Sequence, residues 1–181
     1  MPRELDRCEM IERSIIKKYR RELWAPFVTA NKKYDLSQSG DRICVCISGG
    51  KDSMLMAKLF QLLLRVTEVP FECEYMVMDP GYRAENLRRI LDNADLLRIP
   101  VHVFKSDIFT VADRAEKNPC YLCARMRRGY LYRFARDLGC NKIALGHHFN
   151  DVIETTVMAM FYASMLQGMM PKVKSRKFSQ K

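Results

Sequence analysis

Long apolar runs are missing from this sequence of 181 residues. No apolar run reaches 18 residues, so the sequence predicts no membrane-spanning helix and no membrane partner. The first fourteen residues, MPRELDRCEMIERS, are charged throughout and lack the apolar centre of a secretory signal peptide. The expected location is therefore the cytoplasm.

The dense, paired cysteines of a secreted disulfide scaffold are also missing. The chain has seven cysteines, an odd number, scattered over an ordinary length. Small disulfide-stabilised proteins are shorter and richer in cysteine. We therefore expect reduced thiols, and any closely spaced pair becomes a candidate metal or redox site.

Acidic residues are too few to balance the basic ones. The 31 Lys and Arg exceed the 21 Asp and Glu, which gives a net charge of +10. Five arginines fall between residues 120 and 139, and the last eleven residues contain five basic side chains and no acid. Such a domain usually has an anionic partner, and nucleic acid is the first candidate. The alternative is a solvated basic face on an ordinary soluble protein.

Strands and helices are predicted to alternate after residue 36. Short runs rich in β-branched residues predict buried strands, and apolar residues at helical spacing predict the helices between them. This alternation predicts an α/β fold with a doubly wound parallel sheet, preceded by a helical extension. The expected strands are 42–47, 73–78, 101–104 and 142–147, and the expected helices are 4–24 (interrupted at Pro26), 27–34, 52–65, 84–98, 124–138 and about 150–164.

Polar motifs follow three of the predicted strands. They are SGGKDS (48–53), DPGY (79–82) and GHHFND (146–151). Ligands of such sheets bind beyond the carboxyl ends of the strands, so we expect the three motifs to share one cleft.

SGGKDS has the chemistry of a phosphate-binding loop. Gly49 and Gly50 allow a tight turn and close approach of the backbone to an anion, at the start of a helix whose N–H groups are unpaired. Ser48, Lys51 and Ser53 add two hydroxyls and a positive charge. The Walker pattern G-x-x-x-x-G-K-[ST] does not fit, because Asp52 follows Lys51. Asp52 repels phosphate unless it holds magnesium or orients Lys51.

The stretch ICVCISGGKDS resembles the signature of the PP-loop ATP pyrophosphatase superfamily. The resemblance implies an adenine nucleotide alpha hydrolase-like (HUP-type) fold that binds ATP and holds its pyrophosphate in this loop. It also implies transfer of AMP to a carbonyl-type oxygen. The implied division is a helical extension (1–36), a PP-loop ATP-binding domain (37–170) and a basic tail (171–181).

The stretches NPCYLC…GHHFNDVIET (118–155) and FYASMLQGMMPK (161–172) resemble the tRNA 2-thiocytidine synthetase (TtcA-like) branch. This resemblance implies ATP-dependent tRNA thiolation. The 2-oxo group of a cytidine is adenylated with release of pyrophosphate, and a [4Fe–4S] cluster then transfers sulfur. A sulfur donor such as a cysteine desulfurase is an implied partner, and a homodimer is left open.

Cys120 and Cys123 are the candidate metal ligands. Their spacing lets two thiolates reach one metal centre, just before a predicted helix and among arginines. Half a zinc site or a redox dithiol is an alternative. The resemblance implies a third cysteine ligand beyond MMPK, whereas this chain stops at Lys181. We therefore expect a truncated form that binds a cluster poorly or not at all.

The resemblance implies that Asp151 supports magnesium or the reacting group; Asp151 and Glu154, one helical turn on, alternatively suit the helix end electrostatically. For Asp79 the alternatives are a contact to the ribose or magnesium and a plain Asp-Pro-Gly turn. For Arg127 and Arg128 they are stabilisation of the leaving pyrophosphate, binding of tRNA phosphate and a solvated helix face. The implied catalytic residues are Lys51, Asp52, Arg127 and Asp151, and the implied nucleotide-binding residues are Ser48, Gly49, Gly50, Lys51, Asp52, Ser53, Asp79, Gly146 and His147.

Two other functions stay open at this point. One is a PP-loop ligase acting on a different tRNA base or on a small molecule, and the other is a nucleotide-binding module without turnover. The modified nucleoside and the oligomeric state are not fixed by the sequence. Most of the twelve methionines are expected to fill the core.

Overall fold

The computed structural model of this chain describes residues 4–106, 108, 119–166 and 168–175. Helices and strands alternate in the order that the sequence predicts. The elements are α1 (Arg7–Arg13), the π-helical turns η1 (Ser14–Lys18) and η2 (Arg20–Trp24), α2 (Ala25–Lys33), β1 (Arg42–Ile47), α3 (Lys51–Val66), β2 (Glu72–Asp79), α4 (Ala84–Leu96), β3 (Val101–Lys105), α6 (Pro119–Asp137), β4 (Lys142–Ala144) and α7 (Phe149–Ala163).

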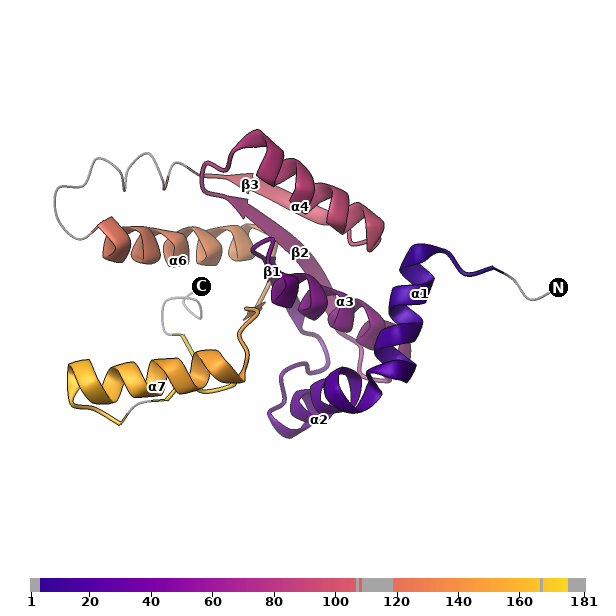
Figure 1. Cartoon of the computed structure of the whole chain (residues 1–181), viewed down its shortest axis with the longest axis horizontal. Coiled ribbons are helices and arrows are strands. Elements are labelled where there is room, and N and C mark those ends of the chain that lie inside the picture. The colour runs from indigo at the N-terminus through magenta and orange to yellow at the C-terminus, as the bar shows by residue number, and fades with distance from the viewer. Residues whose placement is uncertain (1–3, 107, 109–118, 167, 176–181) are drawn as a thin grey trace.

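The four described strands form one parallel sheet in the order β3-β2-β1-β4. The sheet lies between helices, with α3 and α4 on one side and α6 on the other (Figure 1). Successive residues of a strand point to opposite faces, and β1 is apolar on both. Ile43, Val45 and Ile47 join the core with α3 and α4, whereas Cys44 and Cys46 join the core with α6. The predicted doubly wound α/β fold is confirmed.

The N-terminal helices differ from the prediction. A single α-helix over 4–24 is wrong, because the α-helix ends at Arg13 and two π-helical turns follow. An interruption at Pro26 is wrong as well. The chain runs from η2 directly into α2, whose first turn contains Pro26, where a proline needs no N–H partner.

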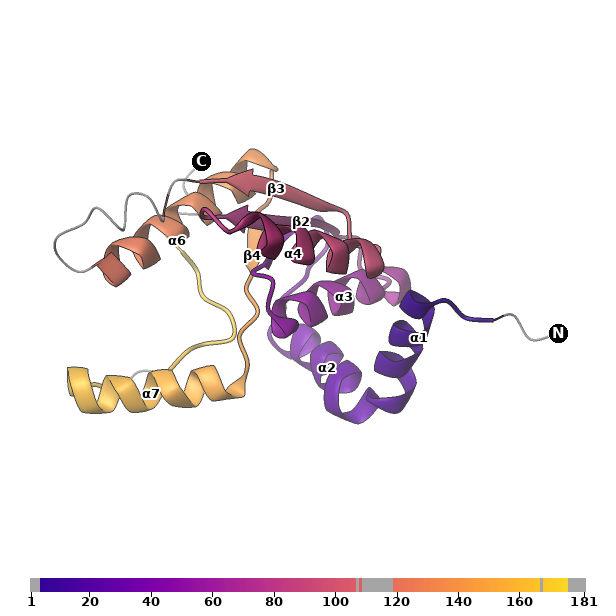
Figure 2. The ribbon, with the colours of Figure 1, turned by 45° about the horizontal axis from the view of Figure 1, so that its top comes forward.

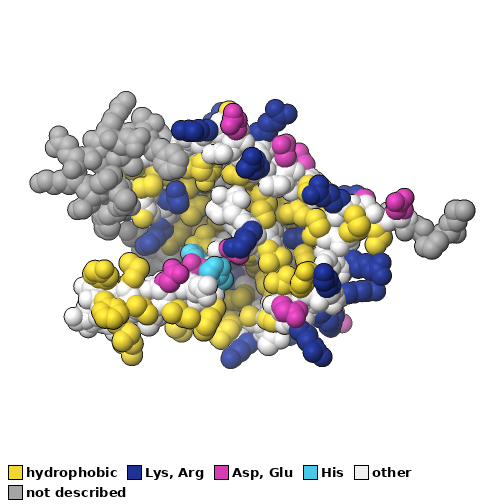
Figure 3. All heavy atoms as spheres, in the orientation of Figure 1, with side chains coloured by type: hydrophobic (Ala, Val, Ile, Leu, Met, Phe, Trp, Pro, Cys, Tyr) yellow, Lys and Arg dark blue, Asp and Glu magenta, His cyan; other side chains and the backbone are white. Residues whose placement is uncertain are grey.

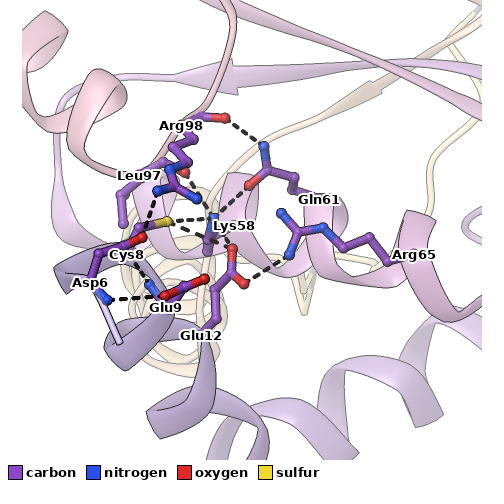
Figure 4. Close-up of polar contacts among 9 residues, drawn as sticks. All are labelled: Asp6, Cys8, Glu9, Glu12, Lys58, Gln61, Arg65, Leu97 and Arg98. Atoms are coloured by element: carbon purple, nitrogen blue, oxygen red, sulfur yellow. Dashed lines mark hydrogen bonds and ion pairs between the residues drawn. The ribbon is translucent and has the colours of Figure 1, made fainter. Parts of the chain in front are cut away.

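A buried lysine ties the N-terminal helices to α3. Lys58 is 1% exposed, and its Nζ lies 2.6 Å from Glu12 Oε1 (Figure 4). The same ammonium donates to Gln61 Oε1 at 2.6 Å, to the Leu97 carbonyl at 2.8 Å and to Cys8 Sγ at 3.3 Å. One charged group therefore connects α1, α3 and the end of α4.

Helix α7 stands away from the sheet in both ribbon views (Figures 1 and 2). None of its residues is buried. The prediction that most methionines fill the core is wrong here, because Met158, Met160, Met165 and Met170 are exposed. Within the described ranges, no helix combines the length and the apolar character that crossing a bilayer requires.

Candidate nucleotide-binding site

The loop after β1 and the loop after β4 meet at the carboxyl edge of the sheet. We call residues 48–53 the glycine loop. A Cβ added to Gly146 would lie 3.0 Å from Ser53 Cα and 3.1 Å from Ser53 N, so the two backbones approach closely. Strand β4 ends at Ala144 instead of the predicted residue 147, and Gly146 therefore lies in the connecting loop. The expected meeting of SGGKDS and GHHFND is confirmed.

The glycine loop presents unpaired N–H groups at the start of α3. Gly50 is the N-cap of this helix, and within the described chain no side chain accepts from the first turn. A helix N-terminus without such an acceptor carries a partial positive charge and free donors. This arrangement suits an anion, as the sequence predicts.

The serines of the glycine loop differ in role. Ser53 is 3% exposed, and its hydroxyl donates to the Gly50 carbonyl at 2.9 Å and accepts from the Ser48 N–H at 3.1 Å. The Ser48 hydroxyl also donates to Ser53 Oγ at 3.1 Å. Ser53 therefore holds the shape of the loop from inside, whereas Ser48 is exposed beside the site.

Position 49 requires glycine for two reasons, the backbone conformation and the lack of room for a Cβ. Its φ is +87°, a region that residues with a Cβ rarely adopt. A Cβ there would also lie 2.7 Å from two carbons of Ile90 on α4. The glycine loop is thus packed directly against α4.

Lys51 and Asp52 form an ion pair at the mouth of the loop. Lys51 Nζ lies 3.2 Å from Asp52 Oδ2, and the lysine side chain is 86% exposed. Asp52 is therefore placed to orient Lys51, one of the two roles expected for it. Its own exposure, 41%, leaves the carboxylate open to an added cation.

His148 is a site residue that the sequence analysis did not select. It is the N-cap of α7, where its Nδ1 accepts from the Asn150 N–H at 3.2 Å. In the neutral ring the proton is then on Nε2, which lies 3.9 Å from Asp52 Oδ2. The spacing from His148 to Asp151 forms a capping box, and this pattern could have identified it.

Asp151 lies next to His148, on the same side of the site. Its Oδ2 accepts from the His148 N–H at 2.7 Å. That backbone hydrogen bond holds the pKa of Asp151 below its ordinary value, and electrostatic interactions with the nearby His148, His147 and Lys51 side chains act in the same direction. Asp151 is therefore a carboxylate at neutral pH, aligned beside the glycine loop.

A cavity of about 240 Å³ lies between the glycine loop and α4. Arg89 lines it and forms no ion pair with any residue that the structure describes. Sequence analysis missed Arg89, although residues 86, 89 and 93 share one face of the predicted helix. The lining residues are Ser48, Gly49, Tyr82, Asn86, Arg89, Ile90 and Asn93.

Other predicted site residues are not brought to the loop by any described contact. Asp79 is 8% exposed, and its Oδ1 accepts from the N–H groups of Gly81 and Tyr82, which is the plain-turn alternative. Glu154 is exposed and has no described contact with Asp151. Arg127 and Arg128 are exposed on α6.

The cysteine pair lies inside α6. Because this helix begins at Pro119, the prediction that the pair precedes the helix is wrong. Cys123 is half-buried, and the side chain of Cys120 lies outside the described part of the structure. Among the described residues, no three His, Cys, Asp or Glu side chains gather as a metal site. The described side chains therefore do not show the three-ligand set of a cluster.

The carboxylates beside the glycine loop fit magnesium better than they fit an iron–sulfur cluster. Mg²⁺ in nucleotide sites is commonly held by one or two carboxylates together with phosphate oxygens and water. Asp52 and Asp151 are the two partly exposed carboxylates that share His148 as a neighbour. They would hold the ion when a nucleotide supplies the phosphates.

Comparison with known proteins places this geometry in a family. The sequence profile of the PP-loop domain matches residues 19–180. The chain belongs to the PP-loop family. The glycine loop, the α3 N-terminus and the GHHFND loop of this PP-loop protein all lie in the matched region.

Curated relatives of this PP-loop protein are tRNA-modifying enzymes. It is 40% identical over 148 residues to the tRNA-cytidine(32) 2-sulfurtransferase of Polynucleobacter asymbioticus, covering 78% of this chain and 48% of the relative. It is 37% identical over 182 residues to the enzyme of the same name from Shewanella sp. (strain ANA-3), covering 97% and 56%. The chain thus spans about half the length of these relatives.

A solved structure shares the fold. The U34-tRNA thiolase NcsA from Methanococcus maripaludis, determined with its [4Fe–4S] cluster, matches with a TM-score of 0.64 and 20% identity. The match covers 84% of this chain and 51% of the thiolase. At this identity the similarity shows the fold alone, and it confirms the α/β fold.

Replacing Gly146 with alanine is expected to weaken ATP binding roughly tenfold or more. The added methyl would press on the Ser53 backbone at 3.0 Å and displace the start of α3, where overpacking costs about 1–3 kcal/mol. Titration calorimetry with ATP measures the change. The control is Gly129→Ala, because a Cβ there meets nothing within 4 Å. Unchanged affinity in Gly146→Ala would show that this contact does not shape the loop.

Proposed function

We propose that this PP-loop protein is an ATP-dependent tRNA 2-thiolation enzyme of the cytoplasm. In the proposed reaction the 2-oxo group of a cytidine attacks the α-phosphorus of ATP, pyrophosphate leaves, and sulfur later replaces the adenylated oxygen with release of AMP. The observation that carries the proposal is the meeting of the glycine loop with Asp151 and His148, in a chain 37–40% identical to tRNA-cytidine(32) 2-sulfurtransferases.

The side chains beside the loop have separate roles in this proposal. The N–H groups at the start of α3 bind the pyrophosphate, and Lys51 neutralises the charge that develops on it. Asp52 orients Lys51, and His148 keeps Asp52 and Asp151 on one side of the site. Asp52 and Asp151 would hold magnesium, which would supply polarisation of the phosphoryl oxygens.

Sulfur delivery is proposed for the Cys120 and Cys123 pair in the first turns of α6. The two-residue gap between these cysteines is the sequence spacing that lets two thiolates reach one sulfur-carrying centre. Support comes from the curated relatives, which are named 2-sulfurtransferases. The proposed sulfur donor is a cysteine desulfurase, and the proposed RNA contacts include exposed arginines of α6 such as Arg127 and Arg128.

The test of this function is nucleoside analysis by mass spectrometry of tRNA from cells that lack the gene. We expect one thiolated cytidine to disappear and to return when the gene is restored. A full set of thiolated nucleosides in the deletion strain would contradict the proposal.

An in vitro assay separates the other activities. ATP–pyrophosphate exchange that requires tRNA supports adenylation of an RNA base. Exchange that needs only a small acid would indicate a different PP-loop ligase, and ATP binding without exchange would indicate a module without turnover.

A further inference from the structure

The cavity between the glycine loop and α4, which we call the α4 cavity, has a lining that suits an anion. Five of its seven lining residues carry N–H or O–H donors in their side chains: Ser48, Tyr82, Asn86, Arg89 and Asn93. Arg89 adds a full positive charge, and none of the lining residues that the structure describes is acidic. A lining with donors, a cation and no carboxylate favours a negatively charged group such as phosphate.

The size of the α4 cavity suits a phosphate group with its water rather than a whole nucleotide. Its volume of about 240 Å³ equals that of about eight water molecules, at about 30 Å³ each in the liquid. Sites that enclose larger ligands measure about 300–1,000 Å³ and are lined mainly by apolar side chains. Here Ile90 and the ring of Tyr82 are the apolar part of the described lining. A nucleobase therefore fits this lining less well than phosphate does.

The position of the α4 cavity connects it to the glycine loop. Ser48 and Gly49 form one wall, and the next residue, Gly50, is the N-cap of α3. Ile90 fixes the wall on α4, because it is 7% exposed and fills the space where a Cβ of Gly49 would lie. Arg89 directly precedes Ile90, so its backbone is held beside the loop. Figure 3 shows Lys and Arg side chains over the part of this face where α4 lies.

The positive charge of Arg89 is available to a ligand. The charge of Lys51 is partly offset by Asp52 at 3.2 Å, whereas Arg89 forms no ion pair with any residue that the structure describes. A guanidinium presents its N–H donors in a planar fork that matches two oxygens of one phosphate. We propose that Arg89 and the α4 cavity bind the terminal phosphate of ATP and hold it until pyrophosphate is released.

This role of Arg89 rests on the proposed function. In that reaction the bond between the α-phosphorus and the oxygen that bridges to the β-phosphorus breaks, and the bridging oxygen keeps the electron pair. The leaving pyrophosphate gains negative charge, which the N–H groups of α3 and Lys51 stabilise at one phosphate and Arg89 at the other. AMP lacks the phosphate that Arg89 binds. The α4 cavity therefore makes the site select ATP over AMP, the product of the reaction.

Titration calorimetry with inorganic pyrophosphate, ATP and AMP, each without tRNA, tests this assignment. In Arg89→Gln the Kd for pyrophosphate and for ATP is expected to rise at least about tenfold, because a charge-assisted hydrogen bond is lost. The Kd for AMP is expected to change less than about twofold. Arg89→Lys keeps the charge but loses the planar fork, so its affinities should lie between those of the wild type and Arg89→Gln. Thermal unfolding should not change, because Arg89 is exposed.

Arg88→Gln is the matched control, because Arg88 is exposed on the same helix and is not among the described lining residues. Unchanged affinity of Arg89→Gln for pyrophosphate would overturn the proposal, and so would a wild type that does not bind pyrophosphate. Equal losses for ATP and AMP would place the nucleobase or the α-phosphate in the cavity instead. A loss confined to tRNA binding would assign Arg89 to RNA.

The proposed function can fail separately from the α4 cavity. If Arg89→Gln shows the expected losses for pyrophosphate and ATP but deletion of the gene removes no thiolated nucleoside, the cavity assignment stands and only the proposed function is wrong. If the thiolated nucleoside disappears while Arg89→Gln binds pyrophosphate and ATP like the wild type, the function stands and the cavity assignment is wrong.

Discussion

Replacing Lys51 with alanine is expected to reduce tRNA-dependent pyrophosphate release at least about 100-fold. The lysine is the full positive charge at the start of α3, and Asp52 holds it at 3.2 Å. A preorganised donor at developing charge commonly contributes about 10²–10³ in rate, because the interaction is strongest in the transition state. Release of labelled pyrophosphate from ATP, measured with and without tRNA, gives the rate.

The same substitution should leave the fold intact. Lys51 is 86% exposed, so the free energy of unfolding should change by less than about 0.5 kcal/mol. Lys105→Ala is the control, because Lys105 is an exposed lysine at the carboxyl end of β3, two strands away from β1. Full pyrophosphate release by Lys51→Ala would exclude the glycine loop from the reaction. Where the wild type binds ATP without turnover, the loss is expected in ATP affinity instead.

The parallel sheet and the order of its elements could be predicted from the sequence. Strand β1 is apolar on both faces, and α3 repeats apolar residues at helical spacing. Each pattern lies within one short segment, so each predicts a single type of secondary structure. The meeting of the glycine loop and Gly146 also followed, because parallel strands place their carboxyl ends at one edge.

The N-terminal helices could not be predicted in the same way. The π-helical turns shift the register so that Ile15 and Trp24 both reach the core formed by α3 and β1. That shift depends on packing against α3, and hydrophobic periodicity over 4–24 does not contain it. A π-helical turn is rare, so the sequence alone favours a regular α-helix.

The exposure of α7 could not be predicted from the sequence either. Its sequence is that of a buried helix, and methionine is a common core residue, yet four of the methionines in and after α7 are exposed. Periodicity identifies the helix but not what covers it. The ring of His148 was missed for a different reason, since its role depends on an N-cap whose position is set by the end of β4.

Lys58→Met is expected to destabilise the protein by about 3–5 kcal/mol. Lys58 is 1% exposed and pairs with Glu12, whose side chain is 16% exposed. Removing Lys58 takes away the buried partner of the Glu12 carboxylate and leaves it with the half-exposed Arg65 alone. Guanidinium unfolding followed by circular dichroism measures the loss. Nothing in the sequence marks this lysine, because it occupies an ordinary position of an amphipathic helix.

Arg65→Met is the matched control. Arg65 donates to the other oxygen of Glu12 at 2.8 Å, but its side chain is 51% exposed. An exposed partner of this kind contributes about 0–1 kcal/mol, so the two variants should differ several-fold in cost. The double variant Lys58→Met/Glu12→Leu removes both buried charges and should recover much of the lost stability. Equal losses of unfolding free energy in Lys58→Met and Arg65→Met would show that the burial of Lys58 does not determine its contribution to stability.

The pH dependence of unfolding gives an independent measure of the same pair. Burial of Glu12 opposes its ionisation, but hydrogen bonds and charges from Lys58 and Arg65 outweigh burial and lower its pKa below the ordinary 4.5. Because the folded-state pKa is the lower one, the contribution is fully present above pH 4.5 and is lost as the pH falls through the folded-state pKa. In Lys58→Met this loss should shrink, since the carboxyl no longer has its buried partner. If Lys58→Met lost the same stability at acid pH as the wild type, other carboxyls, such as Asp41 beside Lys142, would govern acid unfolding.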